Sequence, residues 1–288
     1  DSIHGDLSRR DFTVNSMALE LTGEKPEFID PFNGLQDLAA KVLRTPVRPG
    51  DSFNDDPLRM MRAARFASQL NFEIAPDVLS SMKDLAHRIS IISAERVRDE
   101  FTKIMMSANP RIGITLLVDS GLADIVLPEI PKLRLEVDEH HHHKDVYEHS
   151  ITVLEQAIEH EDRLGGPNLV IRLAALLHDI GKPKTRAFIE GGGVSFHHHE
   201  VVGARLAKKR LQALRFDNDT IDSVELLTML HLRFHGYGEG EWTDSAVRRY
   251  VRDAGEFITH LHVLTRADCT TRNKTKAARL SATYDSLE

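Results

Sequence analysis

The 288-residue sequence contains a single cysteine, Cys269. One cysteine excludes an intramolecular disulfide and a zinc site built from several thiolates, so histidine and carboxylate side chains would have to hold any metal ion. The sequence also lacks the roughly 18 to 20 apolar residues in a row that a membrane span needs, and no signal-like segment opens it. These absences favour a cytoplasmic globular protein with no membrane partner.

Basic residues are also in short supply, because 37 lysines and arginines stand against 44 aspartates and glutamates, for a net charge of −7. This balance excludes a broadly basic nucleic-acid surface but leaves local arginine patches open. The length and the 41% hydrophobic content allow about two domains. The chain begins without methionine and ends in an uncapped helical pattern, so we expect a fragment of a longer protein.

The first half of the chain divides into two regions. Residues 1–48 combine a helical run, FTVNSMALEL (12–21), with a turn at IDPFNG (29–34) and a β-branched stretch, KVLRTPV (41–47), as in a small α/β unit. Residues 49–127 show apolar spacings of three and four behind helix-entry signals such as Asp-Pro and Asn-Pro. We expect four antiparallel helices there, at 55–70, 75–89, 93–106 and 109–122.

A polar, proline-containing stretch, LPEIPKLRLEVDEHHHHKD (127–145), is the best candidate boundary, and we interpret His140 to His143 as part of a solvated linker. Residues 128–288 then form a third region, in which we expect helices at about 145–160, 168–180, 199–214, 218–234, 243–254 and 256–270. The fold class is therefore mainly α.

Sixteen histidines are the anomaly of the composition, and one of them lies in LAALLHDIGKPKTR (173–186). His178 and Asp179 end an almost wholly apolar helix, where both side chains can converge on one ion. We expect Gly181 to form a left-handed cap and Pro183 to stop the helix. The alternative is a solvated Asp179 and a His178 that interacts with the helix dipole.

Other polar residues on or beside apolar helical faces favour the metal interpretation, because four helices can each deliver one ligand to a single point. These residues are His149, His199, His231 and Asp268. We interpret His197 and His198 as loop residues and His235 as an exposed helix-end residue.

The order His149, His178-Asp179, Asp268 resembles the H…HD…D signature of the HD phosphohydrolase superfamily. The resemblance implies an all-helical domain that binds a divalent ion through these four residues, often for phosphoester hydrolysis. His199 and His231 would then be secondary ligands or substrate contacts, and Lys182 could meet a phosphate. Histidine and aspartate ligands suit several transition metals as well as Mg²⁺, so the identity of this metal stays open.

The motif NDDPLRMMRAARFA places Asp56 and Arg59 three residues apart on an expected helix, hence on one face. An acceptor beside a forked donor complements the Watson–Crick edge of cytosine and, after a small shift, of adenine. Arg62 and Arg65 would add charge for a nucleotide or an RNA backbone. The alternative is an ordinary helix cap with Pro57 at the first helical position and a surface ion pair.

The motif RRDFTVNSMALE places Arg9, Arg10 and Asp11 before an expected helix, with Asn15 one turn beyond Asp11. Arginines at a helix start can clamp a triphosphate, while the Asp11 and Asn15 side chains could contact a ribose hydroxyl. The alternative is that these residues are ordinary capping charges.

Four ordered motifs closely resemble the bacterial tRNA nucleotidyltransferase (CCA-adding enzyme) and poly(A) polymerase family. They are RRDFTVNSMALE, DPFNGLQDL, DDPLRMMRAARFASQLNF and ERVRDEFTKIM, and an appended HD domain is also familiar in this family. The resemblance implies the C-terminal remnant of an α/β nucleotidyltransferase palm at 1–48, a helical neck that binds nucleotide and RNA at 49–127, and an all-helical HD domain at 128–288.

The same resemblance implies that the full-length protein adds CMP and AMP to tRNA 3′ ends, with tRNA, CTP and ATP as partners and Mg²⁺ as cofactor. It gives nucleotide-handling roles to Arg9, Arg10, Asp11 and Asn15, base selection to Asp56 and Arg59, a hinge to Asp30 and Gly34, and a neck motif to Glu95 and Arg98. Asp55 and Ser16 depart from the family's usual Glu and Ala.

The family's Gly-Ser loop and paired Asp-x-Asp metal ligands are missing from this sequence, so we expect the catalytic carboxylates upstream of residue 1. The Asp217-x-Asp219 sequence is better explained as a helix cap. Without two carboxylates to hold Mg²⁺, the chain as given should not polymerise nucleotides. The alternatives are an HD phosphohydrolase (nucleotidase or cyclic phosphodiesterase), a poly(A) polymerase, and a noncatalytic RNA-binding module.

Overall fold

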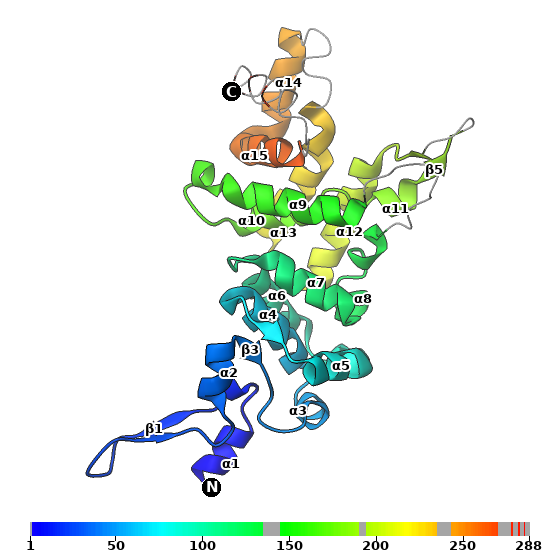
Figure 1. The fold of residues 1–288 in the computed structure, drawn as a ribbon. Helices are drawn as coiled ribbons and strands as arrows, with labels where there is room; N and C mark the ends of the chain where they lie inside the picture. The colour runs from blue at the N-terminus through cyan, green and yellow to red at the C-terminus, as the bar shows by residue number, and fades with distance from the viewer. Residues whose placement is uncertain are drawn as a thin grey trace. The chain divides into compact units, whose positions relative to one another are not determined.

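The computed structural model describes residues 2–134, 145–189, 194–234 and 243–269, together with residues 278, 282 and 285. The chain separates into two compact units, Asp1–Pro128 and Glu129–Glu288 (Figure 1). The expected linker histidines His140 to His143 and the expected helix-end residue His235 lie outside the described residues.

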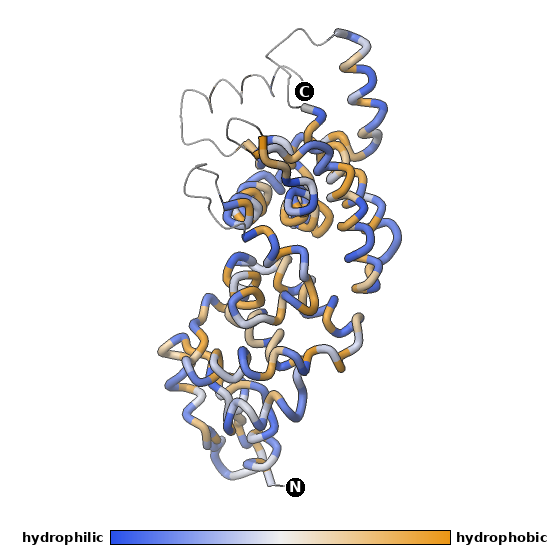
Figure 2. The backbone as a smooth tube through the Cα atoms, turned by 90° about the vertical axis from the view of Figure 1, so that its right-hand side faces the viewer, coloured by the Kyte–Doolittle hydropathy of each residue, from blue (hydrophilic) through white to orange (hydrophobic). Residues whose placement is uncertain are grey.

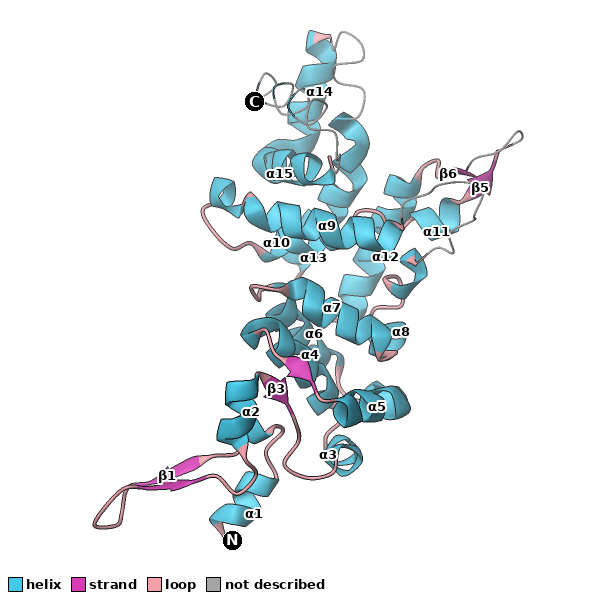
Figure 3. Ribbon diagram, in the orientation of Figure 1, coloured by secondary structure: helices cyan, strands magenta, loops and turns pink. Residues whose placement is uncertain are grey.

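The first unit opens with short elements. Helix α1 (Ile3–Ser8) precedes a 3-10 turn, η1 (Thr13–Asn15), and the strands β1 (Ala18–Glu20) and β2 (Glu27–Ile29) form an antiparallel hairpin with Leu19 opposite Phe28. Helix α2 (Gly34–Ala40) leads to β3 (Val42–Leu43), which pairs in parallel with β4 (Glu73–Ile74) (Figure 3).

The helical run expected at 12–21 is wrong, because this segment forms the 3-10 turn η1 and then strand β1. The Asn15 side chain accepts from the Phe12 backbone N–H at 3.2 Å, and the Ser16 hydroxyl donates to the Phe12 carbonyl at 2.7 Å. These local side-chain bonds satisfy backbone groups that a continuing helix would use, so the chain leaves the helical path.

The rest of the first unit is helical: α3 (Pro49–Asp55), α4 (Leu58–Leu70), α5 (Pro76–Leu85), a 3-10 helix η2 (Ala86–Ile91), α6 (Ala94–Met105), α7 (Pro110–Asp119) and α8 (Leu122–Val126). The four expected helices correspond to α4, α5 with η2, α6 and α7. The α4 and α7 helices pack closely at Gly113, where a Cβ atom would lie 2.4 Å from Ser68 Oγ and 2.6 Å from Ile104 Cγ2.

The second unit contains η3 (Pro131–Leu133), α9 (Val146–Glu159), η4 (Glu161–Leu164), α10 (Leu169–Leu177), α11 (Lys182–Thr185), β5 (Ala187–Phe188), β6 (Val194–Ser195), α12 (His199–Ala213), α13 (Asn218–Leu230), η5 (His231–Phe234), α14 (Asp244–Ala254), η6 (Gly255–Phe257) and α15 (Ile258–Asp268). The β5 and β6 strands form an antiparallel hairpin. Helix α10 packs against α9, α13 and α15, and its residues Leu173 to Leu177 are buried.

The mainly α fold class is confirmed, since the described residues form fifteen α-helices and three two-stranded sheets. Figure 2 shows hydrophobic and hydrophilic residues alternating along the helices of each unit, as amphipathic packing requires. Among the described helices, none combines the length and the apolar character that crossing a bilayer demands.

Candidate functional site

The end of α10 positions the first two candidate ligands, His178 and Asp179. His178 is the C-cap of α10, and the chain continues in right-handed geometry through Gly181 (φ −77°, ψ −22°) into α11. The expected left-handed cap at Gly181 is therefore wrong, and Pro183 lies in the first turn of α11 rather than stopping a helix.

Gly181 is needed for close packing instead. A Cβ atom there would lie 2.1 Å from the His199 carbonyl oxygen and 2.7 Å from the Gly203 nitrogen. Only glycine lets the Asp179 loop approach the start of α12 this closely. That approach brings His199 beside Asp179.

Six candidate ligands, carried on or at the ends of the five helices α9, α10, α12, α13 and α15, meet in the second unit. They fall into two groups, each with its ligand atoms within 4.8 Å of one another: His149, His178 and Asp268 in the first, and Asp179, His199 and His231 in the second. The first group comes from α9 and the ends of α10 and α15, and the second from the loop after α10, the start of α12 and the end of α13. The structure thus brings together all the histidine and aspartate side chains that the sequence singled out for this site.

Asp179 lies between the two groups. Its Oδ2 atom is 3.3 Å from His178 Nε2 and 3.6 Å from His149 Nε2. Its Oδ1 atom is 3.2 Å from His199 Nε2 and 3.9 Å from His231 Nε2. Asp268 completes the first group, with Oδ1 2.9 Å from His149 Nε2 and 3.5 Å from His178 Nε2. The two Asp179 oxygens therefore face different sets of imidazoles.

The imidazole rings are oriented by the backbone. His178, His199 and His231 each direct Nδ1 to the carbonyl oxygen three residues earlier, at 2.8, 2.8 and 2.7 Å. An Nδ1–H that donates to a carbonyl fixes the tautomer whose Nε2 lone pair is available to a metal. The three Nε2 atoms are buried and make no well-formed hydrogen bond among the described residues. Buried, unsatisfied lone pairs next to carboxylates fit a divalent cation.

The electrostatics of the cluster also favour a positive charge. Burial lowers the pKa of His178, but the Asp179 and Asp268 carboxylates outweigh burial and raise this pKa to about 10. Burial lowers the pKa of His231 to about 3, and the neighbouring His178 charge acts in the same direction. Burial would raise the pKa of Asp179, yet His178, His199 and Lys182 hold it well below its usual range. Burial would also raise the pKa of Asp268, but hydrogen bonds from His149 and His178 hold it well below its usual range. Both carboxylates of the cluster are therefore anionic and attract a cation.

Lys182 lies at the edge of this cluster, with Nζ 2.6 Å from Asp179 Oδ2 and 5.7 Å from the centre of the Phe196 ring. Its expected contact with a phosphate stays a prediction. His197 and His198 are exposed residues between β6 and α12. Asp217 caps α13, because its Oδ1 accepts from the Thr220 N–H at 2.8 Å, so its interpretation as a cap is confirmed.

A second cluster lies in the first unit. Asp11 is only 5% exposed, and its carboxylate accepts from Asn15 Nδ2 at 2.7 Å and from Arg62 Nε at 2.5 Å. Arg59 Nη2 donates to the Arg9 carbonyl, and Arg59 Nη1 donates to Ser52 Oγ at 2.8 Å. The structure thus joins the start of the chain to α4. Ser52, which is fully buried, was not anticipated, since no sequence motif distinguishes it.

Arg9 and Arg10 differ from expectation, because they follow the end of α1 rather than begin a helix. Arg9 caps α1 with its backbone N–H and donates from Nε to the Gly5 carbonyl at 3.2 Å. Arg10 forms an exposed ion pair with Asp6 at 3.0 Å. The absence of a continuing helix in this segment explains the error.

Asp56 and Arg59 do not share a helix face, so that prediction is wrong. Asp56 precedes Pro57 and has extended geometry (φ −142°, ψ 99°), as residues before proline prefer. The Asp56 carboxylate accepts from the Leu58 N–H at 3.1 Å and pairs with Arg96 at 3.1 Å, as a helix cap would. Each member of the expected pair therefore has its own partners.

Arg65 also requires correction, because it is part of the interior of the unit. Its side chain is 13% exposed, pairs with Glu100 Oε2 at 2.8 Å, and lies over the Phe66 ring at 4.2 Å. Burial lowers the pKa of Arg65 although Glu100 opposes this. In this position Arg65 supports α6 and does not present its charge to a nucleotide or RNA backbone.

The remaining motif residues have local roles. Asp30 caps α2 by accepting from the Gly34 and Leu35 N–H groups at 2.7 and 3.0 Å. Gly34 lies so close to η1 that a Cβ atom would be 2.1 Å from the Thr13 carbonyl oxygen. Glu95 is in the first turn of α6, and Arg98 pairs with Asp99 at 2.8 Å.

Comparison with family models gives three consecutive matches. Residues 1–44 match the poly A polymerase head domain, residues 71–133 match the probable RNA and SrmB- binding site of polymerase A, and residues 146–273 match the HD domain.

Known proteins with similar sequences include the A-adding tRNA nucleotidyltransferase of Deinococcus radiodurans, 35% identical over 273 residues, which are 93% of this chain and 60% of that protein. The multifunctional CCA protein of Neisseria meningitidis serogroup A is 36% identical over 243 residues, which are 83% of this chain and 55% of that protein. The chain thus spans a little over half the length of these relatives.

Solved structures share the fold. The CCA-adding enzyme of Bacillus stearothermophilus in complex with CTP is 23% identical, with a TM-score of 0.64 over 99% of this chain and 60% of that one. A tRNA nucleotidyltransferase complexed with a primer tRNA and an incoming ATP analog is 17% identical, with a TM-score of 0.66 over 99% of this chain and 73% of that one. The chain belongs to the tRNA nucleotidyltransferase and poly(A) polymerase family and carries an HD domain.

Proposed function

We propose that the complete protein adds CMP and AMP to the 3′ ends of tRNA, with CTP and ATP as the incoming nucleotides. The observation that carries this proposal is the joining of the two nucleotide motifs through the Arg62–Asp11 ion pair and the Arg59–Arg9 hydrogen bond. Two relatives, an A-adding tRNA nucleotidyltransferase and a multifunctional CCA protein, support it. An enzyme that adds nucleotides to tRNA would act in the cytoplasm.

In this proposal residues 1–48 are part of the nucleotidyltransferase palm, residues 49–127 bind nucleotide and RNA, and residues 128–288 are the HD metal-binding domain. Mg²⁺ would stabilise the charge that develops on the transferred phosphoryl group. The paired carboxylates that hold Mg²⁺ in this family are not recognisable in this sequence, so we place them in a part of the complete protein outside it. This chain would then bind nucleotide weakly, if at all, and would not polymerise it.

Asp11 and Asn15 would contact the ribose, because the Asp11 carboxylate is already oriented by the Asn15 amide and by Arg62. Arg9, Arg10 and Arg62 would bind phosphate oxygens.

Base selection by Asp56 and Arg59 would require an exchange of partners. Arg59 would release Ser52 Oγ and the Arg9 carbonyl, and Asp56 would release Arg96, before both side chains met the edge of cytosine or adenine. Because each of these contacts is a single hydrogen bond or an exposed pair, the exchange replaces bonds of similar strength.

The test is incubation of the complete protein with tRNA that lacks its 3′ end, labelled CTP and labelled ATP. Ordered addition of C and A is expected, whereas runs of A alone would identify a poly(A) polymerase. Asp56→Ala and Arg59→Ala should each reduce the preference for CTP and ATP over UTP and GTP more than they reduce tRNA affinity. Lys83→Ala, at an exposed residue of α5, serves as the control. Unchanged discrimination in both variants would show that neither residue selects the base.

We also propose that the HD domain binds divalent transition metal and hydrolyses phosphoesters, as a nucleotidase or a cyclic phosphodiesterase. The observation that favours this second activity is the position of Asp179 between two sets of ligands. His149, His178, Asp179 and Asp268 would hold one ion, and Asp179, His199 and His231 a second. A bound metal would polarise a phosphoryl oxygen and lower the pKa of a water molecule, and Lys182 would orient the phosphate.

Metal analysis of the purified chain, followed by assays with 2′,3′-cyclic nucleotides and nucleoside monophosphates, tests this activity. Hydrolysis that His178→Ala abolishes together with metal content is the expected result. If the chain binds metal but hydrolyses none of these substrates, the metal site of the HD domain has a structural role only. A chain that binds no divalent metal would support a noncatalytic RNA-binding module.

A further inference from the structure

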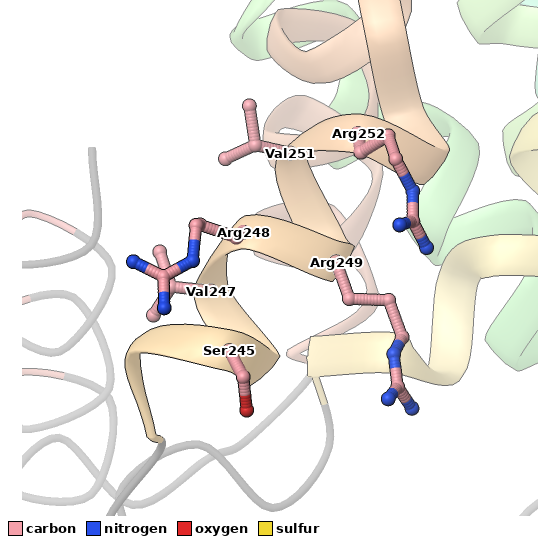
Figure 4. Close-up of a pocket in the computed structure, with 6 residues that line it drawn as sticks. All are labelled: Ser245, Val247, Arg248, Arg249, Val251 and Arg252. Atoms are coloured by element: carbon pink, nitrogen blue, oxygen red, sulfur yellow. The ribbon is translucent and has the colours of Figure 1, made fainter.

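Helix α14 carries a group of arginines that neither proposed site uses. Arg248, Arg249 and Arg252 are all exposed, and Ser245 is exposed one turn before the first two. Residues three and four apart are neighbours on a helix, so Arg252 is next to both Arg248 and Arg249. All three arginines line an open pocket of about 700 Å³, together with Ser245, Val247 and Val251. Figure 4 shows the three side chains projecting away from the helix, Arg249 and Arg252 on one side and Arg248 on the other.

These cations are only partly neutralised. Arg252 approaches Asp253 at 3.3 Å, but Asp253 is also 3.4 Å from Arg233. Arg248 and Arg249 have no ion pair among the described residues. By contrast, Lys208 on α12 has two carboxylates, Glu225 at 2.6 Å and Asp222 at 3.4 Å. The three arginines of α14 outnumber its two aspartates, Asp244 and Asp253, by one, so this helix is locally basic in a chain with a net charge of −7.

The opposite side of α14 is already covered. Tyr250 and Ala254 are buried, and the helix contacts α13 and α15. A basic amphipathic helix that binds membranes inserts its apolar side between lipids, but here that side belongs to the core of the unit. The free side combines three guanidinium groups with two valines, Val247 and the 51% exposed Val251. Two short apolar side chains would bury little area in a bilayer, so the charged groups favour a polyanion.

We propose that Arg248, Arg249 and Arg252 bind the phosphate backbone of RNA, as a surface separate from the HD metal cluster. This inference rests on the proposed function, which makes tRNA the substrate of the complete protein. Guanidinium groups bind phosphate oxygens bidentately, and such contacts give affinity without reading the base sequence. The α14 surface would therefore hold the body of the RNA.

The experiment measures the dissociation constant of labelled tRNA for the 288-residue chain by fluorescence anisotropy, from 50 to 300 mM KCl. We compare wild type with R248Q/R249Q/R252Q and with R205Q/K208Q/K209Q, which removes the same charge from exposed or half-exposed positions of α12. The α14 variant should weaken binding at least about tenfold at 100 mM KCl and reduce the slope of log affinity against log salt by about 2 to 3. The α12 variant should bind within about twofold of wild type.

A charge-preserving variant, R248K/R249K/R252K, should retain most of the slope of log affinity against log salt. The melting temperature followed by circular dichroism should be the same in wild type and in both α14 variants, because all three positions are exposed. Wild-type affinity in the R248Q/R249Q/R252Q variant, or equal weakening in both glutamine variants, would overturn the proposal. So would binding to phosphatidylserine vesicles that is tighter than binding to tRNA and lost in the same variant.

Nucleotide addition by the complete protein is measured in parallel. If the protein extends tRNA but the α14 variant binds as wild type, the inference alone fails. If it extends nothing while the α14 variant still loses RNA affinity, the proposed function alone fails.

Discussion

The cluster around Asp11 in the first unit and the cluster around Asp179 in the second are both built from buried charges, but only one of them is complete. Asp11 receives directed donors from Asn15 and Arg62. Asp179 accepts from Lys182 Nζ at 2.6 Å but otherwise faces imidazole Nε2 atoms, three of which are buried without a well-formed hydrogen bond. The first cluster is satisfied by the protein, whereas the second gains most from a cation.

This difference separates two kinds of site. A cluster whose members bind one another can hold its shape before a substrate arrives and exchange single bonds when it binds. A buried cluster of two carboxylates and several imidazoles attracts positive charge, which Lys182 and the proton on His178 supply here and which a divalent cation would supply in place of that proton. Nucleotide contact in the first unit and metal binding in the second fit these two states.

Asp179→Asn should produce the largest effect, because it removes the one carboxylate that faces both ligand groups. We expect specifically bound divalent metal to be lost from both positions. The loss of metal affinity should exceed the roughly 10- to 100-fold that follows when a residue that only orients a ligand is removed. Elemental analysis of the dialysed protein measures this loss, and thermal melting should no longer shift when metal is added.

His231→Gln is the matched control, since His231 belongs only to the second group. It should remove one ion and leave the other bound by its four ligands, His149, His178, Asp179 and Asp268. Retention of full metal content in Asp179→Asn would contradict the central position that we assign to this carboxylate.

Glu161→Gln should destabilise the second unit without altering metal binding. Glu161 Oε1 and Oε2 accept from Arg172 Nε and Nη2 at 2.6 and 2.7 Å, and both residues are buried. The substitution removes the carboxylate charge from a buried ion pair, and breaking such a pair costs about 3 to 5 kcal/mol. Urea unfolding with and without divalent metal checks this, and the same loss is expected in both conditions.

If added metal instead restored the stability of Glu161→Gln, the buried pair and the metal cluster would be coupled. The Glu161–Arg172 ion pair and the cluster around Asp179 would then not contribute independently to the stability of the second unit.

Arg62→Met should have an intermediate effect in the first unit. It removes one of the two donors to a carboxylate that is 5% exposed, which costs about 1 to 3 kcal/mol. Arg62→Lys restores the charge without the directed Nε donor and should recover part of this loss. Chemical unfolding of the three proteins gives the comparison, and equal stability of wild type and Arg62→Met would mean that Asp11 does not depend on Arg62.

The ligand set of the second unit could be anticipated because each member carries a local signal. His149, His178, His199, His231 and Asp268 lie on or beside apolar helical faces, where polar side chains are uncommon. Helical periodicity also places the long helices, although their ends shift by a few residues. The turn at Gly181 could not be anticipated, because its requirement for glycine arises from α12, which is distant in the sequence.

The side-chain positions of the nucleotide motifs were harder to predict, because they also depend on contacts that the local sequence does not reveal. Spacing alone placed Asp56 and Arg59 on one helix face, while Pro57 forces Asp56 into extended geometry before the helix begins. Arg65 has the spacing of an exposed residue, yet Glu100 on α6 draws it into the interior. Local patterns predict elements well, but the partner of a charge depends on tertiary packing.

Arg10→Gln should have the smallest effect on the free energy of unfolding. It tests whether Arg10 belongs to the hydrogen-bonded cluster around Asp11. Arg10 and Asp6 form an exposed pair four residues apart, so its removal should cost no more than about 0.5 kcal/mol. Chemical unfolding should therefore barely separate Arg10→Gln from wild type, in contrast with Arg62→Met. A loss as large as that of Arg62→Met would mean that Arg10 supports the Asp11 cluster itself. A negligible loss leaves Arg10 free to exchange Asp6 for a phosphate, as a nucleotide-binding arginine must.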